Sequence, residues 1–441
     1  MKKMEVEVKN PNAAGIDIGS KSHFVAVGQA EDEVKEFGVS HTSHQEIIRF
    51  LRDYGVITVA MESTGSYWQP LFIELTKAGF ELLLVPGTQT KGFRKTDVKD
   101  ARQLQQLHTL GILTSCYLPD ELTGKVRELT RFRTTLIQDS TKYVTKMQKC
   151  LRLMNIRLDV LLSDIVGKSG MRIIESILEG KRDPVYLASL ADKRVKKTKE
   201  ELADALLGNY ADEYLYELRV CYRLYNHLQE EFKAVDCEIE RYFLDYFGST
   251  DLPEGVELTP KRTNRKNQPL FDVQKLSYKM YEVDLSAIKG VSTNTILSVM
   301  TEVGTSIHRF PTAKDFACWL GLSPNNRISG GRKISSHIPK GKNPLGTALR
   351  NAANVIGNLQ DGYLSSFFRK LAVRKGRVAA ITATARKLAV IIYNMIVNKE
   401  EYDQDRSSDF QQKMEERKIQ RAIRLLKNQK FNIIDTEGVI M

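Results

Sequence analysis

An acid inside an apolar run is the feature that most constrains the fold of this chain. Residues 13–20 read AAGIDIGS, so Asp17 stands between Ile16 and Ile18. In a β-strand the two isoleucines share one face and Asp17 points to the other. A carboxylate buried alone is costly and tends to protonate, so it needs a cation or a cage of hydrogen bonds. We therefore expect a buried strand that presents Asp17 to a polar site.

The first hundred residues alternate short β-rich runs with segments of helical periodicity. The expected strands lie at residues 13–20, 23–28, 34–39, 57–61 and 81–85, and the expected helices at 44–53 and 68–78. Apolar runs that end at Gly or Pro and alternate with amphipathic segments are typical of this arrangement. Strands interleaved with helices predict a mixed α/β sheet covered on both faces.

From residue 99 onwards the pattern turns helical. Apolar residues recur at three- and four-residue steps from Leu122 to Cys150, and a second long helix is expected over residues 213–247. Such helices pack as a hairpin or against another subunit. The polar stretch 251–269 contains three prolines and reads as a linker or an insertion. The expected divisions are 1–155 (α/β domain with its trailing helix), 156–250 (helical, coiled-coil-like), 251–282 (linker or insertion), 283–400 (mostly helical domain) and 401–441 (charged tail).

Three further acids repeat the pattern of Asp17. Glu62 ends the apolar run VAME, and Asp97 and Asp100 share one face of a helix that starts near Thr96. Four converging acids repel one another without a cation, and ligands that are all oxygen select Mg²⁺ or Mn²⁺. A pair of such ions can activate water and stabilise the leaving oxygen in phosphoryl transfer. Taken singly, Asp17 also suits a strand-end cap, and the Asp97/Asp100 pair a solvated helix start.

The net charge of +12 is concentrated in one part of the chain. Thirteen basic residues lie between positions 327 and 390, and Asp361 is the one acid among them. Phosphate backbones are the usual partner of so one-sided a segment, although a solvated basic face is the alternative. The expected nucleic-acid contacts are Arg327, Arg332, Lys333, Lys340, Lys342, Arg350, Arg374, Lys375, Arg377, Arg386 and Lys387.

Composition also indicates the cellular compartment in which the protein is expected. The five cysteines form no CxxC pair, which favours reduced thiols over disulfides or a zinc site. The apolar runs are too short to cross a bilayer, and the N-terminus lacks an apolar signal core. We therefore expect no membrane partner and a cytoplasmic, nucleoid-associated location.

The acid series and several later motifs together resemble a known family. Asp17, Glu62, Asp97 and Asp100 are similar to the RuvC-like DEDD domain of the IS110 family of insertion-sequence transposases, including its IS1111 branch. The likeness continues in FACWLGLSP at 316–324, ISGG at 328–331 and ATARKLA at 383–389. It covers about residues 13–110 and 285–395. The resemblance implies an α/β RuvC/RNase H-like N-terminal domain, a long coiled-coil-like helical middle and a mostly α C-terminal transposase domain.

The resemblance also implies a catalytic serine. The family's nucleophile precedes a glycine shortly after a Gly-Leu-x-Pro string, which corresponds to Ser329 in this sequence. Its loop, NRISGGRK, has glycines that admit a nucleic-acid backbone and cations that hold phosphate. By itself a Ser-Gly-Gly loop is more often just a turn.

The function implied is DNA transposition. Ser329 would attack a DNA phosphodiester and form a phosphoserine link, while Asp17, Glu62, Asp97 and Asp100 hold Mg²⁺ or Mn²⁺. The family also implies a structured guide RNA, known as a bridge RNA, and a homodimer or tetramer that shares active sites between subunits. The alternatives are a RuvC-like metal-dependent junction nuclease without a covalent intermediate, and a nucleic-acid-binding scaffold without activity.

Overall fold

A computed structural model describes residues 7–28, 33–87, 89, 96–261, 266–339, 343–403, 419 and 423. Two of the expected nucleic-acid contacts, Lys340 and Lys342, lie outside the described residues, as does most of the charged tail. The chain divides into two compact units, Met1–Leu118 and Pro119–Met441. The finer domain limits expected at residues 155, 250, 282 and 400 stay predictions.

The N-terminal unit is built on a five-stranded sheet in the order β3-β2-β1-β4-β5. Its strands are β1 (Ala13–Ile18), β2 (His23–Val27), β3 (Glu33–Phe37), β4 (Thr58–Glu62) and β5 (Glu81–Val85). The pairs β1–β2 and β2–β3 are antiparallel, whereas β1–β4 and β4–β5 are parallel. The mixed α/β sheet expected from the sequence is confirmed, and its arrangement is consistent with a DEDD or RNase H-like domain.

Helices cover both faces of this sheet. On one face, α1 (His41–Asp53) and α2 (Trp68–Lys77) contribute Leu51 and Leu71 to a core that includes Ile16 and Ile18. On the other face, Leu104 of α3 (Asp97–Thr109) joins a smaller apolar cluster with residues of β4 and β5. The alternating side-chain directions of the strands therefore separate a large apolar face from a second face that carries the acids.

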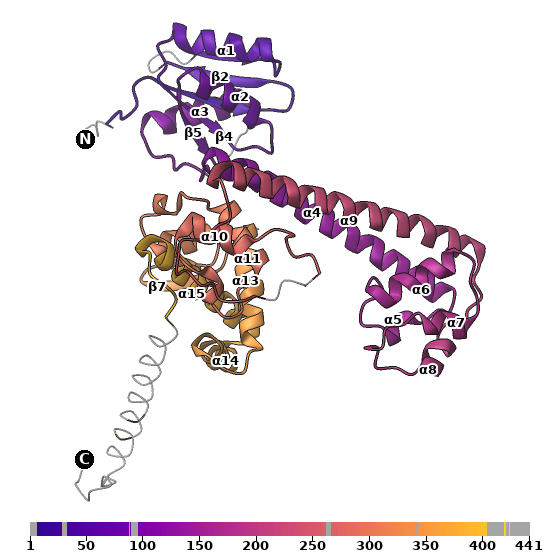
Figure 1. Ribbon diagram of the computed structural model, residues 1–441. Coiled ribbons are helices and arrows are strands. Elements are labelled where there is room, and N and C mark those ends of the chain that lie inside the picture. The colour runs from indigo at the N-terminus through magenta and orange to yellow at the C-terminus, as the bar shows by residue number, and fades with distance from the viewer. Residues whose placement is uncertain are drawn as a thin grey trace, which may run out of the picture. The chain divides into compact units, whose positions relative to one another are not determined.

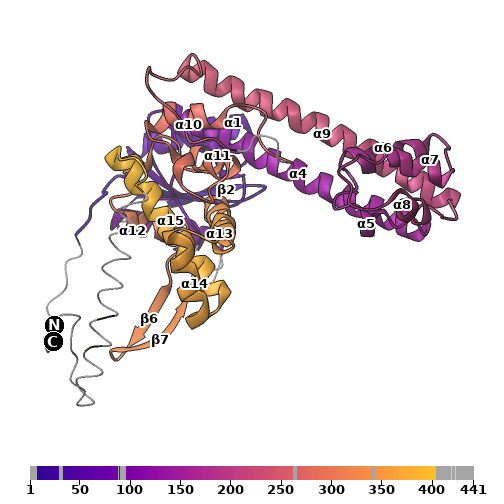
Figure 2. The ribbon, with the colours of Figure 1, turned by 60° about the horizontal axis from the view of Figure 1, so that its bottom comes forward.

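The second unit begins with a long helical hairpin (Figure 1). Helices α4 (Glu121–Leu153) and α9 (Asp212–Phe247) lie side by side in both views, which agrees with the two long helices expected from the sequence (Figure 2). Between them come α5 (Leu158–Leu161), α6 (Lys168–Leu178), α7 (Pro184–Ser189) and α8 (Lys199–Asp204), which share a core with the adjoining ends of α4 and α9.

A buried ion pair joins the two long helices. Arg133 Nε of α4 donates to Asp236 Oδ1 of α9 at 2.5 Å, and both side chains are almost fully buried. Arg133 also donates to the carbonyl of Asn267, and the amide of Leu270 donates to Asp236. The end of the polar stretch after α9 is thus bound to the hairpin. Because a buried charge that loses its partner is strongly destabilising, this pair holds the three segments together.

The C-terminal part of the second unit is mostly helical. It comprises α10 (Val273–Tyr281), η1 (Leu285–Ala287), α11 (Thr293–Glu302), η2 (Ile307–Arg309), α12 (Ala313–Trp319), α13 (Pro344–Gly357), α14 (Tyr363–Lys375) and α15 (Arg377–Asn398). Among the described residues, α15 is the one helix long and apolar enough to span a membrane, and 56% of its most apolar window is buried inside the protein. That burial is typical of a core helix.

Candidate active site and nucleic-acid interface

Asp17 is the penultimate residue of β1, and Glu62 is the last residue of the neighbouring parallel strand β4. Ile16 of β1 pairs with Met61 of β4, so the next position on each strand holds one of the two acids. Both acids are half-buried. Asp17 lies on the face opposite Ile16 and Ile18, as the sequence predicts, because those isoleucines pack under α1 and α2. The two carboxylates therefore share one edge and one face of the sheet.

Helix α3 brings the other two acids towards the same edge. It runs antiparallel to the segment that contains β1: the amide of Asn10 donates to the carbonyl of Thr109, and Gln105 Nε2 donates to the carbonyl of Ala13. Residues closer to the N-terminus of α3 therefore lie beside residues of β1 that are closer to Asp17. Asp100 is half-buried in the first turn of α3, and Asp97 is exposed there.

Gly15 permits this close approach of helix to strand. A Cβ built at position 15 would lie 2.5 Å from the carbonyl oxygen of Ala101 and nearer still to the amide of Gln105. Both atoms belong to the backbone, so no side chain can move aside. The glycine in the GID string therefore determines how closely α3 lies over β1, and with it the position of Asp100 relative to Asp17.

Two groups around Glu62 were not identified from the sequence. Thr64 Oγ1 donates to Glu62 Oε1 at 3.2 Å. A Cβ at Gly87 would lie 2.9 Å from Glu62 Cδ, so the carboxylate rests against the backbone that follows β5. The Pro86-Gly87 dipeptide indicated only the end of a strand, since its contact with Glu62 is made across twenty-five positions of the chain.

The four acids match a hard divalent cation in the chemistry of their side chains. Their donors are all carboxylate oxygens, which Mg²⁺ and Mn²⁺ prefer. Among the described residues, however, no group of three or more His, Cys, Asp or Glu side chains is close enough to hold a metal ion. Asp17 and Glu62 thus share one edge of the sheet, Asp97 and Asp100 are in the first turn of α3, and the four acids do not form a closed set of ligands.

A buried histidine pair lies near the same strands. His23 of β2 is 1% exposed and stacks on His44 of α1 with ring centroids 5.7 Å apart. Burial, together with the nearby His44, lowers the pKa of His23 to about 4. The Glu74 carboxylate accepts a hydrogen bond from Nδ1 of His44 at 3.1 Å. With this lowered pKa, His23 is neutral at pH 7 and contributes no charge to the acid-bearing edge.

Ser329 is the last residue of β6 in a β-hairpin of the second unit, and Figure 2 shows the two strands of this hairpin. Strand β6 (Asn325–Ser329) pairs with β7 (Arg332–His337), and Ser329 is opposite Arg332. The turn consists of Gly330 and Gly331, whose φ angles of 54° and 74° are both in the left-handed region that glycine adopts without strain. The turn expected from Ser-Gly-Gly is confirmed, and the serine is exposed.

The expected nucleic-acid contacts fall into two exposed groups and one half-buried group. Arg327, Arg332 and Lys333 are exposed on the hairpin, and Arg374, Lys375 and Arg377 are exposed where α14 meets α15. The half-buried residues are Arg350, Arg386 and Lys387. Arg350 donates to the carbonyl of Gly321, and this bond occupies part of its guanidinium inside the unit.

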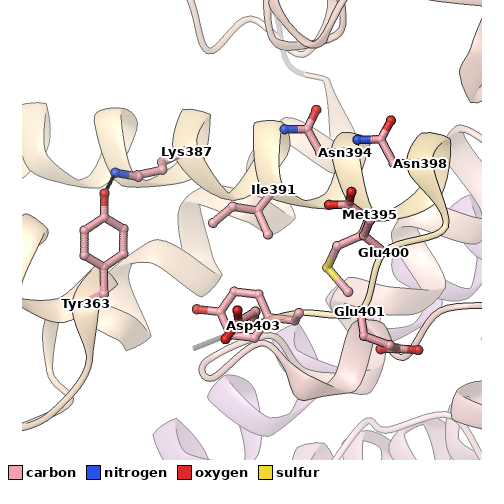
Figure 3. Close-up of a pocket in the computed structure, with 10 residues that line it drawn as sticks. Tyr363, Lys387, Ile391, Asn394, Met395, Asn398, Glu400, Glu401 and Asp403 are labelled. Carbon is pink, nitrogen blue, oxygen red and sulfur yellow. Dashed lines mark hydrogen bonds between the residues drawn. The ribbon is translucent and has the colours of Figure 1, made fainter. Parts of the chain in front are cut away.

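Lys387 is the expected contact that is most involved in packing. Its ammonium lies 4.1 Å from the centroid of the Tyr363 ring and is hydrogen-bonded to that tyrosine (Figure 3). Burial lowers the pKa of Lys387. It lines a cavity of about 540 Å³ that also includes Asn394 and the acids Glu400, Glu401 and Asp403. The three acids make this cavity unfavourable for a phosphate.

Comparisons with known proteins match both units of the chain. A family model for DEDD transposases of IS110, described as a transposase, matches residues 14–156. A second model, described as the transposase IS116/IS110/IS902 family, matches residues 284–368. The first match includes all four acids, and the second includes Ser329.

A curated relative shares part of the sequence. The chain is 32% identical over 123 residues to the transposase for insertion sequence element IS1111A of Coxiella burnetii (strain RSA 493 / Nine Mile phase I). The match covers 27% of this chain and 33% of the relative, so the chain matches about a third of that protein's length. Together the two family matches span more than half of the chain, in the order in which the sheet and the hairpin occur. The chain belongs to the IS110 family of transposases.

Proposed function

We propose that this protein is a DNA transposase that cuts and rejoins strands through a covalent bond between Ser329 and a DNA phosphate. One observation carries the proposal: a single chain of this family has both a sheet edge with Asp17 and Glu62 and an exposed serine on a basic hairpin. The proposed site of action is the nucleoid in the cytoplasm.

The acid-bearing edge is the proposed metal-binding half, with an RNase H-like fold of the RuvC type. Asp17, Glu62, Asp97 and Asp100 would hold Mg²⁺ or Mn²⁺, which supplies charge stabilisation for a pentacoordinate phosphate. The chain's own contribution is orientation. The Thr64 hydroxyl and the Gly87 backbone limit the rotation of the Glu62 carboxylate, and the register of β1 and β4 keeps Asp17 beside it.

Ser329 is the proposed nucleophile. Its Oγ would form a bond to phosphorus while one phosphate ester bond of the strand breaks, and the serine proton would pass to the departing sugar oxygen. Arg332, the partner of Ser329 across the hairpin, would hold a non-bridging phosphate oxygen. Attack of a sugar hydroxyl on the phosphoserine would rejoin the strand and return the serine.

The exposed cations are the proposed nucleic-acid interface. Arg327, Arg332 and Lys333 with Arg374, Lys375 and Arg377 form two exposed basic groups, and the remaining expected contacts are Lys340, Lys342, Arg350, Arg386 and Lys387. Such cations grip a phosphate backbone without reading bases. The family suggests that sequence is read by a structured guide RNA, and that a dimer or tetramer combines the two halves of the site from different subunits.

A denaturing gel tests the covalent step. Protein is mixed with Mg²⁺, labelled DNA from the flanks of the gene and RNA transcribed from those flanks. We expect a protein–DNA adduct that disappears in Ser329→Ala and persists in Ser335→Ala, a neighbouring serine on β7. An adduct that survives Ser329→Ala would disprove the assignment of the nucleophile.

The second candidate is a metal-dependent junction nuclease of the RuvC type. It is favoured by the acid-bearing edge taken alone, since acids and metal suffice for hydrolysis. It predicts free 5′-phosphate ends, no adduct, and normal cleavage by Ser329→Ala. A non-enzymatic scaffold predicts instead that Asp17→Ala changes nothing.

A further inference from the structure

The serine hairpin has two chemically different faces. Ser329 pairs with Arg332, and the adjacent pair, Ile328 with Lys333, points to the opposite side because side chains alternate along a strand. The register shifts between Arg327 and Ile328, which leaves Ile334 without a partner in the ladder. In such a bulge two residues oppose one, so Ile334 lies beside Lys333 across from Ile328. One face therefore carries the Ser329 hydroxyl and the Arg332 guanidinium, and the other carries two isoleucines beside Lys333.

These isoleucines do not contribute to a core. Ile328 is 65% exposed and Ile334 is 70% exposed. The hairpin extends away from the helices of its unit, and its residues are exposed along nearly their whole length (Figure 2). A two-stranded hairpin with no second layer is only marginally stable in water. The apolar face is therefore suited to burial against a partner.

The charges of the segment indicate which partner. No Asp or Glu occurs between Asp315 and Asp361, and the charged side chains described on the hairpin are Arg327, Arg332 and Lys333. A partner must therefore accept two exposed isoleucines and three cations within a few residues. Double-stranded DNA offers both surfaces together, because each nucleotide joins an apolar base plane to an anionic phosphate.

We propose that Ile328 and Ile334 form a wedge that enters a base step next to the phosphate attacked by Ser329. This inference rests on the proposed function, since it uses Ser329 as the nucleophile. Apolar side chains inserted between bases unstack and kink a duplex in other DNA-binding proteins. A β-branched side chain suits this role because its χ1 angle is stiff.

The spacing of Ile328 and Ser329 along β6 is close to one base step. Neighbouring residues of a β-strand are about 3.3 Å apart, and neighbouring base pairs are about 3.4 Å apart. With Ser329 and Arg332 facing the phosphate, Ile328 and Ile334 on the other face of the tip meet the base plane of the adjacent step. Unstacking frees the strand so that its phosphorus becomes accessible to the serine hydroxyl.

Base unstacking can be measured without chemistry. The Ser329→Ala protein is mixed with a duplex from the flanks of the gene that carries 2-aminopurine beside the cleavage position, together with RNA transcribed from those flanks. We expect its fluorescence to rise on binding, and the rise to be lost when Ile328→Ala and Ile334→Ala are added. The matched control is Val185→Ala on α7, because Val185 is also 70% exposed.

The catalytic consequence is tested with Ser329 intact. We expect the double isoleucine variant to form roughly tenfold less adduct on paired DNA, as the loss of about 1.4 kcal/mol implies. A mismatch placed at the wedge step should restore the yield, because that step is already unstacked. Equal yields on paired DNA, or no recovery on the mismatch, would overturn the wedge.

The outcomes separate this inference from the proposed function. If the wild type forms no adduct on any DNA, the serine mechanism fails, and the fluorescence of the Ser329→Ala complex still decides whether the hairpin unstacks a base. If the isoleucine variants instead lower self-association in sedimentation and leave the fluorescence unchanged, the apolar face binds a second copy of the chain and the wedge is excluded.

Discussion

The acid-bearing edge of the N-terminal sheet and the serine hairpin of the second unit are built in opposite ways. The acids stand on paired strands and on a helix whose close approach Gly15 permits. The side chains of Asp17 and Glu62 are half-buried. The hairpin has two strands, a glycine turn and almost no buried side chain. The comparison teaches that packing within the folded unit holds the acid-bearing half of the proposed site in place. The hairpin half lacks such packing and is suited to being held by a bound ligand.

Replacing Asp17 should have the largest effect. Asp17→Asn keeps the shape of the side chain and removes a charge from the proposed metal ligands, so DNA cleavage should fall on the order of a thousandfold. The control is Asp53→Asn, an exposed acid at the end of α1. Single-turnover cleavage measures the effect, and Mg²⁺ should raise the Tm of the wild type but not of Asp17→Asn. Unchanged cleavage would remove Asp17 from the site.

Two glycine variants test this difference between the packed acid-bearing edge and the exposed hairpin. Gly15→Ala forces a Cβ into the backbone of α3, and overpacking of this kind costs about 3 kcal/mol of stability. Gly330→Ala, in the hairpin turn, meets nothing within 4 Å and should leave global unfolding unchanged, although its positive φ strains the turn. Urea unfolding of Gly15→Ala is followed by Trp68 fluorescence in a Trp319→Phe background, which reports the N-terminal unit. Unfolding of Gly330→Ala is followed by Trp319 fluorescence in a Trp68→Phe background, which reports the second unit. Equal losses of stability in Gly15→Ala and Gly330→Ala would contradict this difference between the two regions.

The buried histidine predicts how pH acts on the N-terminal unit. His23 has a pKa of about 4 in the folded protein, below the ordinary 6.5, so the unfolded chain binds its proton first as the pH falls. Stability is therefore lost between pH 6.5 and about 4, and the loss at pH 5 is about 2 kcal/mol. His23→Phe should flatten this part of the profile. A variant with the profile of the wild type would show that another group titrates.

The smallest expected effect is that of one hairpin cation. Arg332→Ala should weaken DNA binding by about 1 kcal/mol and reduce the slope of log affinity against log salt by about one. Lys77→Ala, an exposed lysine at the end of α2, should change neither quantity. Fluorescence anisotropy at several salt concentrations measures both. A salt slope equal to that of the wild type would place phosphate away from the hairpin tip.

Local features of the proposed site could be predicted from the sequence. The alternation around Asp17 predicts its separation from Ile16 and Ile18, which the sheet confirms. A helix starting near Thr96 was expected, and α3 begins at Asp97 with Thr96 as its N-cap. The glycine turn after Ser329 was also expected and is present. In each case the cause lies within a few residues: strand alternation, a capping hydroxyl, or a left-handed φ.

Features that depend on distant residues could not be predicted. The hairpin bulge that brings Ile334 beside Lys333 follows from a register between two strands, and pattern alone does not set that register. The half-burial of Lys387 depends on Tyr363, which belongs to another helix. From the sequence, Lys387 is predicted to contact nucleic acid in the same way as the exposed cations, because a sequence shows the charge of a residue but not its burial.

The sequence by itself determined on which kind of element each residue of the proposed site stands, because strand alternation, helix capping and glycine turns are local. Only the tertiary structure decided that Gly15 meets the backbone of Ala101, that Gly87 supports Glu62, and that the hairpin remains exposed. Those outcomes come from close packing between segments far apart in the chain, which no local pattern encodes.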